Sequence, residues 1–104
     1  MKIMEDLLEA KLNLDTALIG WHELQRQFAS GCVISVRPGL DLVEAALSVS
    51  RDETRKVESW IRDGKMGKAT DEEARIWHES KASVWAVVVK PWVLVQELRP
   101  ESLQ

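Results

Sequence analysis

The sequence predicts an α+β fold, with four or five helices packed on a small sheet of two or three short strands. Three observations support this class: helically spaced apolar residues in the first 31 positions, capping motifs in the middle, and a Val- and Trp-rich run near the end. The 104 residues suffice for one hydrophobic core, so we expect a single domain over 1–104, in which 98–104 form a flexible tail.

Composition limits the class of protein. The chain is 45% apolar and 30% charged, as in ordinary globular domains, and its net charge of -3 gives no broad positive field for nucleic acid. Cys32 is the single cysteine and the N-terminus lacks a signal-peptide pattern, so we expect a cytoplasmic protein. The longest apolar run, 84–95, is interrupted and too short to span a membrane, so no membrane partner is expected.

The N-terminal third predicts two helices. Apolar residues recur every three or four positions from 3 to 18, although the polar residues between 13 and 16 weaken the pattern and allow a break. A second helix is expected over 20–31, because Gly31 stands where a left-handed C-terminal cap belongs.

The middle of the chain carries helix-start signals. A capping box joins an N-cap oxygen to the backbone three residues later and a Glu side chain back to the N-cap. Asp52 offers a further cap for a helix that ends at Gly64. The pairs with capping-box spacing are Asp41 with Glu44 and Thr70 with Glu73.

Two regions predict strands. Residues 32–36 are short and rich in β-branched side chains, and 84–97 has no helical polar face. A straight 84–97 would span about 45 Å, too long for a domain of this size. Pro91 lacks a backbone N–H, so the bend belongs at Lys90-Pro91 and gives two arms, 84–90 and 92–97.

Four stretches carry a family resemblance, and the last is the most distinctive because Pro91 lies between two Trp-containing apolar runs. The stretches are 21–31, 38–44, 57–64 and 85–96. With them the chain resembles a family of short bacterial proteins catalogued as domain of unknown function 2288. The resemblance implies a small bacterial cytoplasmic protein without an assigned activity, so it assigns no functional residue.

One alternative function is binding of RNA or single-stranded nucleic acid. Gly64 and Gly67 form a GxxG pattern with Lys65 and Lys68, and KH domains clamp a nucleic-acid backbone with such a loop. The simpler interpretation is that Gly64 caps one helix while Gly67 turns toward the next. We therefore treat nucleic-acid binding as the less favoured alternative.

A second alternative is a small enzyme that uses carboxylate or histidine chemistry. Asp41 and Glu44 are already explained by helix capping, and His22 and His78 have no third ligand at a metal-binding spacing. Cys32 opens an apolar strand and is better explained as a packed side chain. The sequence therefore favours a non-enzymatic protein with no catalytic residue, metal or cofactor.

The favoured function is a protein-protein interaction or self-associating module, with a homodimer as the expected form. An apolar strand pair is too small for a self-sufficient sheet and needs helices or a second copy to cover it. Tryptophan is enriched at interface hot spots, although both C-terminal tryptophans would also fit a core. The predicted interface residues are Trp85, Pro91, Trp92 and Leu94.

Overall fold

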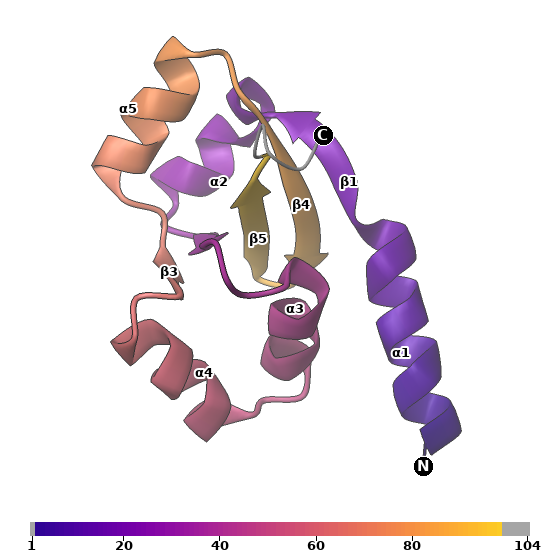
Figure 1. The fold of residues 1–104 in the computed structure, drawn as a ribbon. Coiled ribbons are helices and arrows are strands. Elements are labelled where there is room, and N and C mark those ends of the chain that lie inside the picture. The colour runs from indigo at the N-terminus through magenta and orange to yellow at the C-terminus, as the bar shows by residue number, and fades with distance from the viewer. Residues whose placement is uncertain (1, 99–104) are drawn as a thin grey trace.

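The structure, a computed structural model, describes residues 2–98, so the predicted tail lies outside the described residues except for Leu98. The α+β class is confirmed (Figure 1). In chain order the elements are α1 (Lys2–Asp15), β1 (Ala17–Gly20), the 3-10 helix η1 (Trp21–Leu24), α2 (Gln25–Ala29), β2 (Val33–Val36), α3 (Leu42–Ser50), α4 (Thr54–Arg62), β3 (Met66–Lys68), α5 (Asp71–Glu79), β4 (Ser83–Val89) and β5 (Trp92–Glu97).

The sheet has five strands in the order β1-β4-β5-β2-β3. All neighbours are antiparallel except β2 and β5, which pair in parallel. The predicted bend is confirmed, because Lys90 and Pro91 form the turn of the β4–β5 hairpin, with a cis peptide bond between them. This hairpin lies in the middle of the sheet. The prediction of a two- or three-stranded sheet was therefore wrong.

The two strands that the sequence did not predict are β1 and β3, at the two edges of the sheet. Ala17 and Leu18 continue the helical spacing of α1, but α1 ends where Thr16 Oγ1 donates a hydrogen bond of 2.7 Å to the Leu12 carbonyl. β3 occupies the stretch that the GxxG pattern assigned to a loop. Each edge strand forms because a partner from elsewhere in the chain lies beside it.

Two apolar clusters fill the two faces of the sheet. One face is covered by α1, α3 and α4, and the other by η1, α2 and α5 (Figure 1). In the second cluster the ring of Trp21 meets Phe28 and Trp77 edge-on, at centroid distances of 5.6 and 4.9 Å. Alternation along β4 sends Val84 and Ala86 to this cluster and Val87 to the other.

The helix ends follow the local signals closely. Gly31 and Gly64 have φ of +74° and +75° and close α2 and α4, as predicted. Asp52, predicted as an N-cap, instead has φ 59° just after α3, and Glu53 is the N-cap of α4. The full capping box forms at Thr70, whereas the side chain of Asp41 accepts a 2.9 Å bond from the Glu44 N–H without the reciprocal contact.

Candidate functional site

β1 is an edge strand whose outer side has no partner among residues 2–98. The Trp21 N–H donates to the Ala82 carbonyl at 2.9 Å. This bond shows which residues of β1 turn their backbone groups toward β4. In an antiparallel pair every second residue turns its backbone groups away from the partner. The N–H and C=O groups of Leu18 and Gly20 therefore point outward along the open edge.

Apolar side chains accompany this open edge. Leu14, in the last turn of α1, is 83% exposed, and Leu18 is 45% exposed. Trp85 of β4 is the cross-strand neighbour of Leu18 and is 38% exposed. Cross-strand neighbours share one face of a sheet, so Leu18 and Trp85 form one apolar surface beside the edge. We call Leu14, Leu18, Trp85 and the strand β1 the β1 edge surface.

The opposite edge of the sheet differs in length and charge. β3 has three residues, and Lys65 and Lys68 stand at its two ends. Short strands and lysines are the usual means of preventing edge-to-edge pairing. β1 has the sequence Ala-Leu-Ile-Gly and carries no charge. β1 is only one residue longer than β3, so the two edges differ mainly in the lysines that β1 lacks.

The predicted interface residues are dispersed. Trp85 belongs to the β1 edge surface, whereas Pro91 is exposed at the hairpin turn and Trp92 is half-buried. Leu94 is 0% exposed and lies in the core, so in this structure it offers no surface to a partner. Because β4 and β5 both have neighbours on each side, the hairpin provides no open edge.

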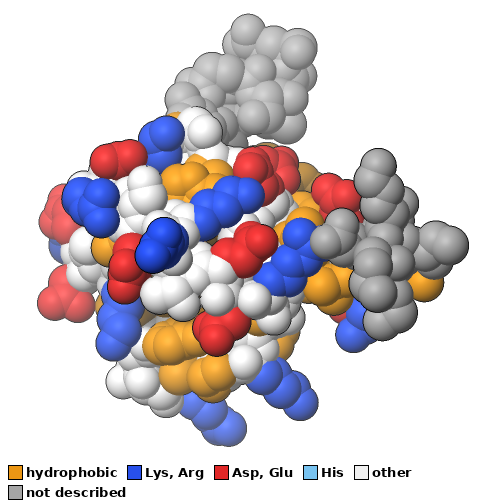
Figure 2. Space-filling model, turned by 90° about the horizontal axis from the view of Figure 1, so that it is seen from below, with side chains coloured by type: hydrophobic (Ala, Val, Ile, Leu, Met, Phe, Trp, Pro, Cys, Tyr) orange, Lys and Arg blue, Asp and Glu red, His pale blue; other side chains and the backbone are white. Residues whose placement is uncertain are grey.

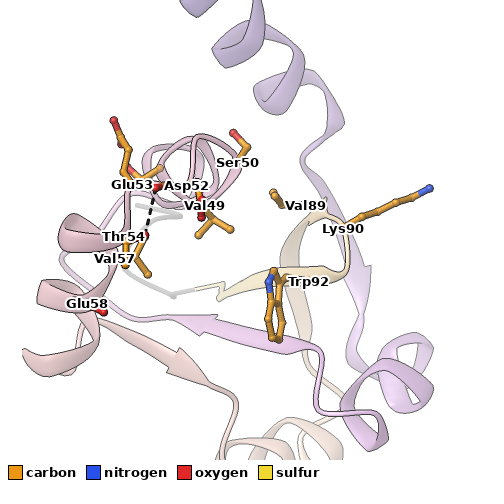
Figure 3. Close-up of a pocket in the computed structure, with 11 residues that line it drawn as sticks. Val49, Ser50, Asp52, Glu53, Thr54, Val57, Glu58, Val89, Lys90 and Trp92 are labelled. Carbon is orange, nitrogen blue, oxygen red and sulfur yellow. Dashed lines mark hydrogen bonds between the residues drawn. The ribbon is translucent and has the colours of Figure 1, made fainter.

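Trp92 lines a pocket of about 510 Å³ between α3, the start of α4 and the hairpin. Figure 3 shows Val49 and Trp92 on its walls and the side chain of Lys90 pointing away from it. Thr54 Oγ1 donates a 3.4 Å hydrogen bond to the Asp52 carbonyl. No hydrogen bond or ion pair among the described residues joins two of the carboxylates that line this pocket, which are those of Asp52, Glu53 and Glu58.

The residues of the nucleic-acid alternative do not form a loop between two helices. The Lys65 N–H donates to the Trp60 carbonyl at 2.8 Å, which completes the cap of α4, and Gly67 lies inside β3. Seen from below, basic and acidic side chains alternate over the surface and apolar ones show between them (Figure 2). The face drawn in Figure 2 therefore presents no uniform positive field.

The histidine and carboxylate candidates for enzyme chemistry lie in two places, and Cys32 lies apart from both, with its Sγ 3.8 Å from the Ser30 carbonyl oxygen. His22 and His78, which are 56 positions apart in sequence, line one pocket of about 450 Å³ together with Lys81. At the start of α3 the side chain of Asp41 accepts the Glu44 N–H, and Glu44 Oε2 lies 3.9 Å from Lys56 Nζ. Within residues 2–98, no three His, Cys, Asp or Glu side chains are grouped to hold a metal ion.

Glu73 forms the densest polar network among the described residues. Its Oε2 accepts from the Ser35 hydroxyl at 2.8 Å, and its Oε1 lies 3.2 Å from Arg37 Nη2. The same Oε1 accepts the Thr70 N–H at 3.0 Å. Burial alone would raise the pKa of the Glu73 carboxyl, but the hydrogen bonds, led by those from Arg37, hold this pKa below its ordinary value of 4.5. The network joins α5 to β2.

The fold and its surfaces define a small α+β protein in which a five-stranded mixed sheet leaves one uncharged edge strand open. The chain belongs to the DUF2288 family of proteins of unknown function, whose family model matches residues 7–97. It is similar to the NMR solution structure of PA1075 from Pseudomonas aeruginosa, with 41% identity, a TM-score of 0.81, and coverage of 91% of this chain and 88% of that one. No curated protein matches the sequence.

The family resemblance seen in the sequence is thereby confirmed, and it brings no activity with it. None of the helices within residues 2–98 is long and apolar enough to cross a membrane. Any statement about function must therefore come from the surfaces described above.

Proposed function

We propose that the protein is a non-enzymatic interaction module that pairs with a second copy of itself along β1. The supporting observation is the β1 edge surface. It is an open, uncharged edge strand that carries the exposed Leu18, with the exposed Leu14 beside it. An edge of this kind is a template for a further strand. The partner that the proposal names is the same strand from an identical chain.

The pairing is antiparallel about a two-fold axis. The outward N–H and C=O groups of Leu18 and Gly20 then bond to the same groups of the second copy, and the two sheets become one. A two-fold interface uses the same patch on both subunits, so every contact of Leu18 and Trp85 is made twice. Backbone hydrogen bonds supply the register, and the apolar side chains supply most of the stabilisation.

The absence of charge on β1 favours a second copy as the partner. Strands that pair about a two-fold axis bring their own side chains close to one another, and like charges opposite each other are destabilising. A strand made of Ala17, Leu18, Ile19 and Gly20 has no such repulsion. β1 has no charged residue that self-pairing would bring opposite its own copy, whereas β3 ends at Lys68.

The proposed self-association site is β1 and not the hairpin. The sequence predicted it around Pro91 because the C-terminal strands were expected to lack neighbours, but β1 and β2 supply those neighbours. Trp85 remains part of the surface. We therefore expect Trp85→Ala to weaken association and Trp92→Ala to leave it nearly unchanged.

The decisive variant is Leu18→Lys, which places a charge on the outer edge as natural edge strands do. We expect the wild-type chain to sediment as a dimer at micromolar concentration. Leu18→Lys should raise its dissociation constant at least about tenfold, which corresponds to about 1.4 kcal/mol. Ile76→Lys on α5 is the matched control, because Ile76 is 46% exposed and Leu18 is 45% exposed.

Circular dichroism would show that both variants remain folded. A wild-type chain that sediments as a monomer over the whole concentration range contradicts the proposal. Equal weakening by Leu18→Lys and Ile76→Lys also contradicts it, because the effect would then not depend on β1.

A further inference from the structure

A third hollow lies near the edge of the sheet opposite β1, between the helices α3 and α4 and the strands β2, β3 and β5. It has a volume of about 350 Å³, within the usual range of ligand pockets, and its exposed lining is almost entirely apolar. We call it the Trp92 groove. Its lining includes Ile34, Ile61, Met66, Lys68 and Trp92.

The groove exists because α4 covers the sheet incompletely. None of the residues of α4 is fully buried, although Val57, Trp60 and Ile61 are spaced along one helical face. Val57 and Trp60 are half-buried against the first apolar cluster, and Ile61 remains 51% exposed. An amphipathic helix that leaves part of its apolar face open presents a surface that water solvates poorly.

The charge at the groove has one sign. Lys68 is the one ionisable residue that lines it, and no carboxylate lines it. Lys68 forms no ion pair with any described residue. Its Nζ lies 3.9 Å from the place that a Cβ on Gly31 would occupy, at the C-terminal end of α2. The groove thus has an apolar wall and, among its lining residues, the Lys68 side chain, whose ammonium group lies beside Gly31.

We propose that the Trp92 groove binds the anion of a medium-chain fatty acid. The aliphatic chain lies against Trp92, Ile34 and Ile61, and the carboxylate is paired with the Lys68 ammonium group. The single cation argues for an anionic head, and the apolar lining argues against a ligand that is polar throughout. The site is independent of the proposed self-association, because β3 and β1 are opposite edges of the sheet (Figure 1).

The test is a titration of the full chain with decanoate, kept below its micelle-forming concentration and followed by amide and indole NMR shifts. We expect saturable shifts at the Trp92 indole N–H and at Ile61, and none at Ile76. Decanol should bind more weakly, because it has the same chain without the charge. Lys68→Glu should weaken decanoate binding about tenfold, since it replaces an attraction by a repulsion.

Two matched controls accompany these variants. Lys65→Glu makes the same change of charge next to β3 at a residue that does not line the groove. Ile61→Asp should abolish binding, whereas Ile76→Asp, at a similarly exposed isoleucine on α5, should leave it unchanged. The proposal is overturned if decanoate shows no saturable binding or if decanol binds equally well. It is also overturned if Lys65→Glu weakens binding as much as Lys68→Glu.

Discussion

Replacing Trp21 by alanine should lower the free energy of unfolding by about 3–5 kcal/mol. Trp21 is 1% exposed and stands at the centre of the second apolar cluster, where its ring meets Phe28 and Trp77. The substitution removes one of the two tryptophan side chains of this cluster and leaves a cavity in a close-packed interior. A small domain is stable by only about 5–15 kcal/mol, so the loss is a large share of the total.

Urea unfolding followed by far-UV circular dichroism measures this loss. Trp85→Ala is the matched control, because Trp85 is 38% exposed and should cost less than about 1.5 kcal/mol in a monomeric sample. Similar losses for Trp21→Ala and Trp85→Ala would show that the cluster around Trp21 is not the core of that face. The near-UV signal should also fall most in Trp21→Ala, because edge-on ring contacts fix the orientation of Trp21 and Trp77.

Replacing Glu73 by alanine should lower the free energy of unfolding by about 2–3 kcal/mol. The change removes the capping-box contact with Thr70 and leaves both Arg37 and the buried Ser35 hydroxyl without their partner. Glu72→Ala is the matched control one position away. Glu72 is exposed and pairs with Arg75 on the helix surface, so its removal should cost much less than the removal of Glu73. A loss at Glu72→Ala as large as at Glu73→Ala would contradict a structural role of the network.

The same carboxyl gives stability a pH dependence. The folded pKa of Glu73 is lowered, so its contribution is fully present above the ordinary value of 4.5 and is lost as pH falls through the folded pKa. We expect the difference in unfolding free energy between the wild type and Glu73→Gln to shrink below pH 4.5. A difference that stays constant from neutral to acidic pH would show that the charge of Glu73 does not contribute.

Features set by neighbouring residues were largely predictable. The cap at Thr70 and the glycines at positions 31 and 64 act within one helical turn, and each ends or begins its helix as the sequence indicates. The position of the hairpin turn was also predictable from one residue, because Pro91 interrupts the apolar run between β4 and β5. Asp52 is the exception, because an aspartate suits both an N-cap and the left-handed position after a helix.

Features set by distant pairing were not predictable in the same way. β1 has four residues, and its Ala17 and Leu18 also fit the stripe of α1. Only the pairing with β4, almost 70 positions away, makes them a strand. Thr16 before the strand and Gly20 at its end were the available signals of a separate element. The Trp92 groove likewise joins β2, α4 and β3, so no local pattern could have identified Ile34 and Ile61 as neighbours.

Pairing along β1 has its most direct consequence at the backbone amides of this strand. Leu18 N–H points away from β4, whereas Ile19 N–H points toward it. Amide hydrogen exchange should therefore be measured at two protein concentrations, below and above the dimer dissociation constant. We predict that exchange of the Leu18 amide slows at the higher concentration, while Ile19 is protected at both. Rapid exchange of the Leu18 amide at both concentrations, with Ile19 still protected, would contradict pairing along β1.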